Sequence, residues 1–208
     1  MKDRAAGEEK IGLSASILIG RSKRMGRDKA KLKIGQQTFL GHIIQELSIC
    51  DEVFLSSAVN NDYSEYGLDV IMDEKPDSGP IEGIRRSLYH AAYDDVFICA
   101  YDMPFFRREM VPFLKDRKDP GHDIVVFRDA ERVHPLCGIY GRSVLPVIER
   151  FISEGRRRMM DLLDSVPTKY VDIADGGFPG DVLRNVNTPE EYREVSSIAG
   201  SQGVNPLN

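Results

Sequence analysis

Short apolar runs alternate along the chain with longer segments in which apolar residues recur at helical spacing. The short runs predict strands over 16–20, 52–57, 69–72, 95–100 and 123–127, with shorter strands over 137–140 and 170–172. The helical spacing predicts helices over 39–49, 80–92, 107–114, 145–153, 156–163 and 189–197. Because strands and helix-length connections alternate, we expect an α/β fold with three layers, built on a mostly parallel, doubly wound, Rossmann-like sheet.

The length of 208 residues predicts one domain, because such a chain can bury a sizeable core and no repeat or low-complexity linker divides it. We expect this domain to cover residues 15–198. Residues 1–14 are polar and are expected to form a flexible lead-in, and residues 199–208 a flexible tail.

The composition excludes several classes of function. A net charge of −5 does not suggest a general nucleic-acid-binding surface, and no apolar run reaches the roughly 18–20 residues that span a bilayer. Cys50, Cys99 and Cys137 are odd in number and form no CxxC pair, and the N-terminus lacks the apolar stretch of a signal peptide. We therefore expect free thiols in a cytoplasmic protein, with neither nucleic acid nor membrane as a partner. The four histidines are scattered, so a zinc site is not expected.

A basic, glycine-containing segment follows the first predicted strand. It reads ILIGRSKRMGRDKAKL over residues 17–32, in a chain that is acidic as a whole. Such a loop can bind phosphates through backbone N–H groups, with Lys and Arg side chains supplying charge. Its spacing matches neither the Walker A loop nor the GxGxxG dinucleotide motif. A solvated basic loop is the alternative on composition alone.

Two aspartates follow later strands of the predicted sheet. Asp73 ends the strand over 69–72, and Asp102 follows the strand over 95–100. Ligands of open α/β sheets bind beyond the carboxyl ends of the strands, so we expect both carboxylates and the basic segment at one edge. Asp102 could ligate Mg²⁺, and Asp73 could accept from a nucleobase or ribose donor. The alternatives are a turn or helix-cap aspartate and a plain loop.

Two further segments combine a structural signal with a possible binding role. The arginines over 156–158 could hold a second anion, or could form a solvated helix start. Thr188 and Glu191 have the spacing of a capping box, with Pro189 at the first helical position. The box leaves Asn185 and Asn187 unexplained, and their amides could serve either a ligand or a turn.

Taken in order, five motifs resemble those of the MobA-type molybdenum cofactor guanylyltransferases. They are ILIGRSKRMGRDKAKL, GPIEGI, AYDMPFF, HPLCGIY and NVNTPEEY, and they span residues 17–192. The resemblance implies a nucleotide-diphospho-sugar-transferase-like fold. It also implies the transfer of GMP from GTP to molybdenum-molybdopterin, which gives the guanine dinucleotide cofactor and pyrophosphate with Mg²⁺ as cofactor. Molybdoenzymes or their chaperones are the implied protein partners.

The resemblance also implies roles for individual residues. The expected nucleotide-binding residues are Ile17, Leu18, Ile19, Gly20, Lys29, Asn60, Asp73, Gly79 and Asp102. Arg24 and Lys29 are expected to neutralise the triphosphate, and Asp102 to hold Mg²⁺. Arg156, Arg157, Asn185 and Asn187 are expected to face the molybdopterin.

Ile19 departs from the resemblance because the family has a glycine at this position. Glycine adopts positive φ freely and isoleucine does not. We therefore expect this position to bear on base selection. Two alternatives stay open. One is a nucleotidyltransferase with another base or acceptor, such as a cytidylyltransferase of the same cofactor or a sugar- or polyol-phosphate enzyme. The other is a non-catalytic cofactor-binding chaperone.

Overall fold

The structure, a computed structural model, describes residues 10–20, 29–75 and 77–201, with side chains as far as Ser197. A seven-stranded sheet forms its centre, in the order β5-β4-β1-β6-β8-β7-β9. The strands are β1 (Ser14–Ile19), β4 (Glu52–Ser57), β5 (Val70–Met72), β6 (Asp95–Ala100), β7 (Ile124–Arg128), β8 (Val133–Gly141) and β9 (Thr168–Asp172). A two-stranded ribbon, β2 (Lys33–Ile34) and β3 (Gln37–Thr38), lies apart from it.

The sheet is mostly parallel, as predicted. β1 pairs in parallel with β4 and β6, β4 with β5, and β7 with β9. β8 pairs antiparallel with both β6 and β7. The prediction of a short strand over 137–140 was wrong in length, because β8 begins at Val133 and reaches Gly141. Since β8 is antiparallel, its first residues lie at the edge where the parallel strands end.

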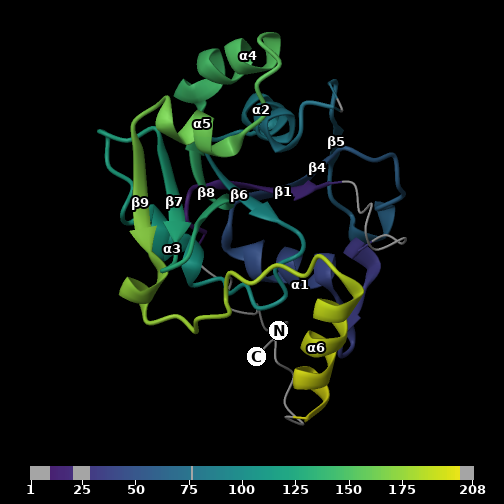
Figure 1. Cartoon of the computed structure of the whole chain (residues 1–208). Coiled ribbons are helices and arrows are strands. Elements are labelled where there is room, and N and C mark those ends of the chain that lie inside the picture. Colours follow the sequence, from purple (N-terminus) through teal and green to yellow (C-terminus); the bar gives the residue numbers. More distant parts are fainter. Residues whose placement is uncertain (1–9, 21–28, 76, 202–208) are drawn as a thin grey trace, which may run out of the picture.

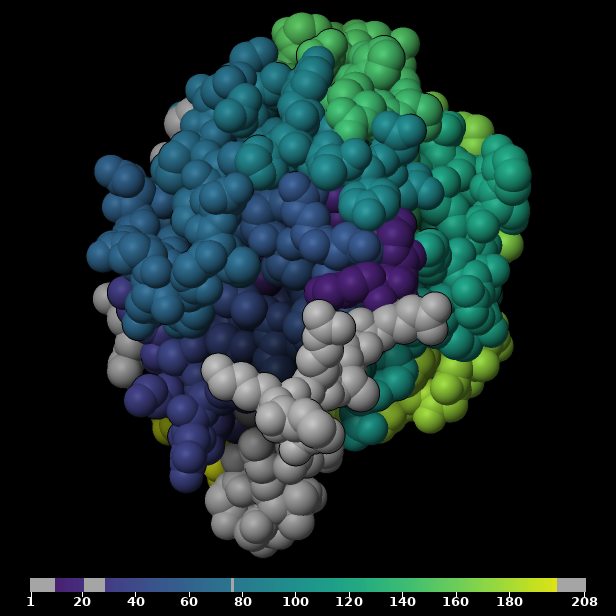
Figure 2. Space-filling view, turned by 180° about the vertical axis from the view of Figure 1, so that it is seen from behind, coloured from purple at the N-terminus to yellow at the C-terminus, as the bar shows by residue number. Residues whose placement is uncertain are grey.

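Helices cover both faces of the sheet, which confirms the three layers (Figure 1). α2 (Pro80–His90), α4 (Leu145–Ser153) and α5 (Met159–Asp164) pack in one apolar cluster with Leu18, Ile98 and Val126. α1 (Phe39–Glu46) and α3 (Met110–Lys115) pack on the other face with Ile17, Phe97 and Val125. In the space-filling view from behind, the green residues of α4 form the top of the molecule, above the blue and teal residues that include α2 (Figure 2).

α6 (Pro189–Ser201) packs beside the β2–β3 ribbon and α1. The Tyr192 hydroxyl donates to the Lys33 carbonyl oxygen at 2.8 Å, and the Tyr192 and Phe39 rings meet edge to face. The 3-10 helices are η1 (Lys29–Lys31), η2 (Leu47–Ile49), η3 (Ser64–Tyr66), η4 (Arg142–Val144) and η5 (Ile173–Gly176).

Capping residues and glycines explain where α1 and α2 begin, and why α5 begins later than predicted. The Thr38 hydroxyl accepts from the Gly41 amide at 3.0 Å and caps α1. Pro80 opens α2 after Gly79, whose φ of 70° lies in the region that favours glycine. The predicted helix over 156–163 begins only at Met159, because Gly155 ends α4 with a φ of 69° and Arg158 is extended.

The folded domain extends further at both ends than predicted. Leu13 is buried, the Lys10 ammonium donates to the Ser48 and Cys50 carbonyl oxygens, and the Gly12 and Leu13 amides donate to Asp51. Residues 10–14 therefore belong to the domain rather than to a lead-in, and α6 continues past 198 to Ser201. The remaining lead-in and tail, 1–9 and 202–208, lie outside the described residues.

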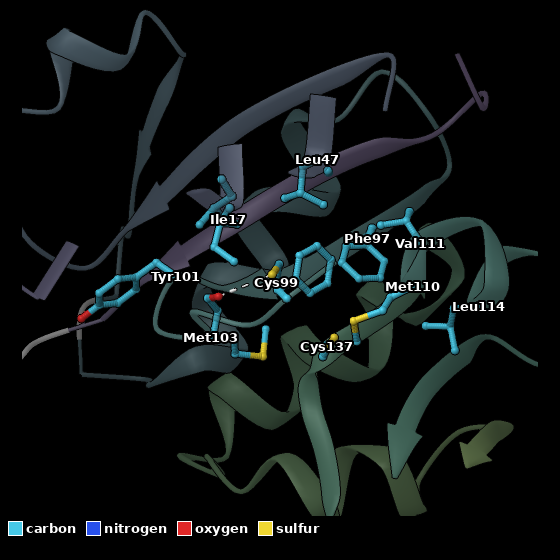
Figure 3. Packing of buried hydrophobic residues seen from close by; sticks show 14 of the residues in the cluster. Ile17, Leu47, Phe97, Cys99, Tyr101, Met103, Met110, Val111, Leu114 and Cys137 are labelled. Carbon is cyan, nitrogen blue, oxygen red and sulfur yellow. Dashed lines mark hydrogen bonds between the residues drawn. The ribbon is translucent and has the colours of Figure 1, made fainter. Parts of the chain in front are cut away.

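All three cysteines are buried and free, as predicted. Burial raises the pKa of the Cys50 thiol to about 12, so the thiol stays protonated. Cys99 and Cys137 lie in the core with Ile17 and Leu47 (Figure 3). In the described part of the chain, no helix is both long and apolar enough to cross a membrane.

Candidate functional site

A cavity of about 570 Å³ opens at the edge of the sheet where the parallel strands end. Its walls include residues that follow four strands: Gly20 after β1, Ala58 after β4, Asp73 after β5 and Asp102 after β6. The predicted convergence of Asp73 and Asp102 at one edge is therefore confirmed. The volume falls in the range of roughly 300–1,000 Å³ that is typical of ligand sites.

A buried ion pair lies in this cavity. The Lys29 ammonium, at the start of η1, is 2.9 Å from the Asp102 carboxylate oxygen Oδ2. It also donates to the Val186 carbonyl oxygen at 3.0 Å and to the Asn187 side-chain oxygen at 3.1 Å, and lies 5.6 Å from the centre of the Tyr101 ring. A buried charge is tolerated only when it is paired and hydrogen-bonded, and these four contacts meet that requirement.

The segment NVNTPEEY closes the cavity against Asp102. The Asn185 amide donates to Asp102 Oδ1 at 2.7 Å, and the Val186 amide donates to the Asp102 carbonyl oxygen at 3.0 Å. Glu191 accepts from the Thr188 amide while its own amide donates to the Thr188 hydroxyl, so the predicted capping box is confirmed. Sequence reasoning assigned Asn185 and Asn187 to a second substrate and missed that both contact the ion pair.

Some residues at the end of β1 line the cavity, whereas the side chain of Ile17 lies in the core. Leu18, Ile19 and Gly20 line the cavity. The side chain of Ile17, predicted at a base-contacting position, instead lies in the hydrophobic core beside Leu47 and Cys99 (Figure 3). Successive side chains of a strand point to opposite faces, which separates Ile17 from Leu18.

Ile19 has ordinary extended backbone at the end of β1. It pairs with Ser57 of β4, and no described residue other than glycine has a positive φ. The backbone here therefore does not need the left-handed conformation that glycine favours. Its side chain is buried among core residues and also borders the cavity.

The opposite end of the cavity is built on Asp73, Gly79 and Gly83. Gly83 allows α2 to approach β1 closely, because a Cβ atom at this position would lie 3.2 Å from the Leu18 side chain. Gly79 lines the cavity and is the N-cap residue of α2.

The buried carboxylate of Glu82, which the sequence analysis did not predict, stabilises the Asp73 end of the cavity. Glu82, in the first turn of α2, accepts from the Glu74 and Lys75 amides at 3.0 and 3.2 Å. The Arg85 guanidinium donates to both Glu82 oxygens and also contacts Glu74. Glu82 thus connects α2 to the loop that carries Asp73. A charged residue between Ile81 and Ile84 on an amphipathic helix was the signal in the sequence.

Besides Ile17, three predicted residues do not line the cavity or cannot be placed. Asn60 is exposed in the loop after β4 and is not part of the cavity wall. The Arg156 guanidinium lies 3.6 Å from the centre of the Phe151 ring, close to Glu154 and Asp161, whereas its neighbour Arg157 does line the cavity. Arg24 lies outside the described residues.

The side chains that could bind a metal ion at the cavity are few, so they suit an ion that takes most of its ligands from a substrate and from water. Asp102 supplies one carboxylate at the cavity, and the described residues contain no group of three or more metal-binding side chains. Mg²⁺ is usually bound by one or two carboxylates together with substrate phosphates and waters. The residues present therefore fit a magnesium ion bound jointly with a phosphorylated ligand.

Comparisons with known proteins agree with this geometry. Residues 15–169 match the profile of the MobA-like NTP transferase domain. A probable molybdenum cofactor guanylyltransferase of Carboxydothermus hydrogenoformans is 30% identical over 190 residues, covering 89% of this chain and 96% of that protein. The molybdenum cofactor guanylyltransferase of Vibrio cholerae is 32% identical over 183 residues, covering 86% and 88%.

Two solved structures share the fold. The molybdopterin-guanine dinucleotide biosynthesis protein A of Archaeoglobus fulgidus has a TM-score of 0.79 at 22% identity, over 91% of this chain and 100% of that chain. The 2-C-methyl-D-erythritol 4-phosphate cytidylyltransferase of Thermus thermophilus has a TM-score of 0.65 at 15% identity, with the same coverage.

Proposed function

The chain belongs to the family of MobA-like NTP transferase domains, and we propose that it transfers GMP from GTP to the phosphate group of molybdenum-molybdopterin. The products are the guanine dinucleotide cofactor and pyrophosphate. The observation that carries the proposal is the buried Lys29–Asp102 pair, which places a cation and a carboxylate together in the cavity. The curated relatives named for this activity match across most of the chain.

The proposed reaction joins two phosphates. A phosphate oxygen of the acceptor attacks the α-phosphorus of GTP, a new P–O bond forms, and the bond to the leaving pyrophosphate breaks in line. Because the attacking phosphate monoester is already anionic, no general base is required. The protein's contribution is positioning and neutralisation of charge, as in other phosphoryl transfers.

Lys29 and Asn185 have defined tasks in this scheme. The Lys29 ammonium shifts from Asp102 toward the phosphates and neutralises charge that develops on them. Asn185 holds Asp102 Oδ1 through its amide and keeps the carboxylate oriented. Arg24 is proposed as a second cation for the triphosphate. Leu18, Ile19, Asp73 and Gly79 are proposed to bind the nucleoside, and Arg157 to hold the acceptor.

Asp102 would hold Mg²⁺ together with the phosphates. Bound there, the ion supplies Lewis-acid neutralisation of the phosphate oxygens. We also propose that the protein acts in the cytoplasm and passes its product to molybdoenzymes or their chaperones.

A panel of nucleotides tests the proposal. The purified protein is given Mg²⁺ and molybdopterin-bound molybdenum with GTP, CTP, ATP or UTP, and pyrophosphate release and dinucleotide mass are measured. We expect GTP to be used best. Lys29→Ala and Asp102→Ala should each lower the rate about 10²-fold, which is on the order of 3 kcal/mol for one preorganised contact.

Three outcomes would contradict the proposal. Preference for CTP or another nucleotide would assign a different base. GTP binding without turnover would favour a cofactor-binding chaperone. A rate within threefold of wild type for both alanine variants would remove Lys29 and Asp102 from catalysis.

A further inference from the structure

A second, smaller cavity adjoins the first at the beginning of β8. It has a volume of about 180 Å³ and is formed by residues 132–136 with Met103 and Asn185. Leu136 and Asn185 line both cavities, so the two are neighbouring compartments. Because sites that hold a whole ligand are typically roughly 300–1,000 Å³, the small compartment suits one end of a ligand whose remainder lies in the main cavity.

The order of the strands shows where this compartment lies relative to the two ends of the main cavity. Asp73 follows β5 and Ala58 follows β4, on one side of the sheet edge. Asp102 follows β6, and the small cavity lies beyond it, at β8. A ligand with its nucleoside near Asp73 and its phosphates at Lys29 and Asp102 leaves the far compartment for the molecule that attacks the α-phosphorus.

A histidine in this compartment is held in a fixed orientation. His134 is buried, and its Nε2 lies 2.6 Å from Asp129 Oδ2. Asp129 in turn accepts from the Glu131 and Arg132 amides at 2.8 Å each. Burial raises the pKa of Asp129, but the hydrogen bonds from His134 and the two amides outweigh it and hold the pKa below its ordinary value.

The other ring nitrogen of His134 is available to a ligand. Within the described residues, Nδ1 makes no hydrogen bond. It is also not a fully buried atom, so a ligand can reach it. Arg132 and Asn185 add polar residues to the same wall, while Met103, Pro135 and Leu136 add apolar surface. This combination suits a planar heterocycle rich in nitrogen and oxygen.

We propose that the small cavity binds the pterin head of the acceptor, with His134 Nδ1 and Arg132 as polar contacts and Asp129 as the residue that positions His134. The inference rests on the proposed guanylyl transfer and assigns the acceptor's binding residues within it. A pterin offers ring nitrogens and an exocyclic amine as hydrogen-bond partners, and a flat ring surface for Met103, Pro135 and Leu136.

The test uses His134→Gln with His122→Gln as its matched control. Glutamine can keep a donor to Asp129 in place of Nε2 while removing the atom at the position of Nδ1. His122 also pairs with an aspartate, at 2.8 Å from Asp119, but it precedes β7 and lies outside both cavities. The probe is fluorescent 6-hydroxymethylpterin monophosphate, whose quenching is titrated with the full-length protein.

We expect His134→Gln to weaken probe binding tenfold or more and to raise the KM for the molybdopterin acceptor by a similar factor. The KM for GTP should stay within twofold of wild type, and so should every parameter of His122→Gln. Asp129→Asn should act in the same direction by releasing the ring of His134.

Unchanged probe binding in His134→Gln would overturn the inference, and so would an equal rise of both KM values. Failure of the proposed function is a different result. If the wild-type protein forms no dinucleotide, guanylyl transfer is wrong, and the pterin titration still decides whether the small cavity binds the probe.

Discussion

At the scale of single residues, the burial of His42 makes the stability of the protein depend on pH. The ring is buried in α1, and its Nε2 lies 2.9 Å from the Phe106 carbonyl oxygen, which fixes the segment that follows Asp102. Burial lowers the pKa of His42 to about 4 from an ordinary value of 6.5, although the hydrogen bond to Phe106 opposes this. The neutral ring is therefore part of the native structure.

This histidine should make the protein less stable in mild acid. Between pH 6.5 and 4 the unfolded chain takes up a proton that the native chain does not, so the free energy of unfolding falls as pH falls and levels off below 4. Between pH 7 and pH 5 the loss from His42 should be about 2 kcal/mol. Urea unfolding at both pH values measures it.

His42→Gln is the control, since its amide can still donate to the Phe106 carbonyl oxygen. The contribution of other groups, such as Glu46, whose pKa burial raises, is common to both proteins and cancels. An equal loss of stability in wild type and His42→Gln would show that His42 is not responsible.

At the scale of elements, the N-terminal turn of α2 and the loop after β5 form one unit through Glu82. The carboxylate accepts two loop amides and two Arg85 donors in a fully buried position. The loop carries Asp73, and Gly79 begins the helix at the same end of the cavity. The geometry of the nucleoside end therefore depends on a side chain that does not line the cavity.

Glu82→Gln should weaken this unit and, with it, nucleotide binding. Loss of the charge-assisted bonds to Arg85 should lower the free energy of unfolding by about 1.5–3 kcal/mol and raise the KM for GTP several-fold. Chemical unfolding and steady-state kinetics measure the two effects. Glu190→Gln removes an exposed pair with Arg193, neither of which lines the cavity, and should cost roughly 0–1 kcal/mol with no change in KM. Similar effects of the two variants would contradict a special role for Glu82.

At the scale of the whole molecule, the site is assembled from both halves of the chain. Lys29 and Asp73 come from the first half, and Asn185 from near the end. A nucleotide that contacts all of these can bind only the folded protein, so it stabilises that state by mass action.

GTP with Mg²⁺ should therefore raise the melting temperature more than CTP, ATP or UTP. At a concentration of 100 times Kd the stabilisation is about 2.7 kcal/mol, which for a domain of this size raises Tm by about 5–10 °C. Differential scanning fluorimetry measures the shift. Lys29→Ala should lose most of it, while equal shifts for the four nucleotides would contradict selection of guanine.

Much of the fold followed from the pattern of apolar residues, because that pattern is local. The strands β1, β4 and β6 and the helices α1, α2 and α4 lie where the periodicity predicted them. The length and direction of β8 did not follow, since periodicity carries no information about which strand pairs with which. The motif assigned Ile17 to the site, but it carries no information on the direction of the side chain, which alternation along the strand places in the core, away from Leu18.

The sequence by itself determined that this is an α/β nucleotidyltransferase, and that Lys29, Asp73 and Asp102 belong to one edge of the sheet. Chain order and the rule that parallel strands end at a common edge suffice for that. Only the tertiary structure decided that Asn185 holds Asp102 across 83 positions, that Glu82 supports the Asp73 loop, and that Arg157 rather than Arg156 reaches the cavity. Such contacts depend on the directions of side chains after packing, and sequence spacing does not encode those directions.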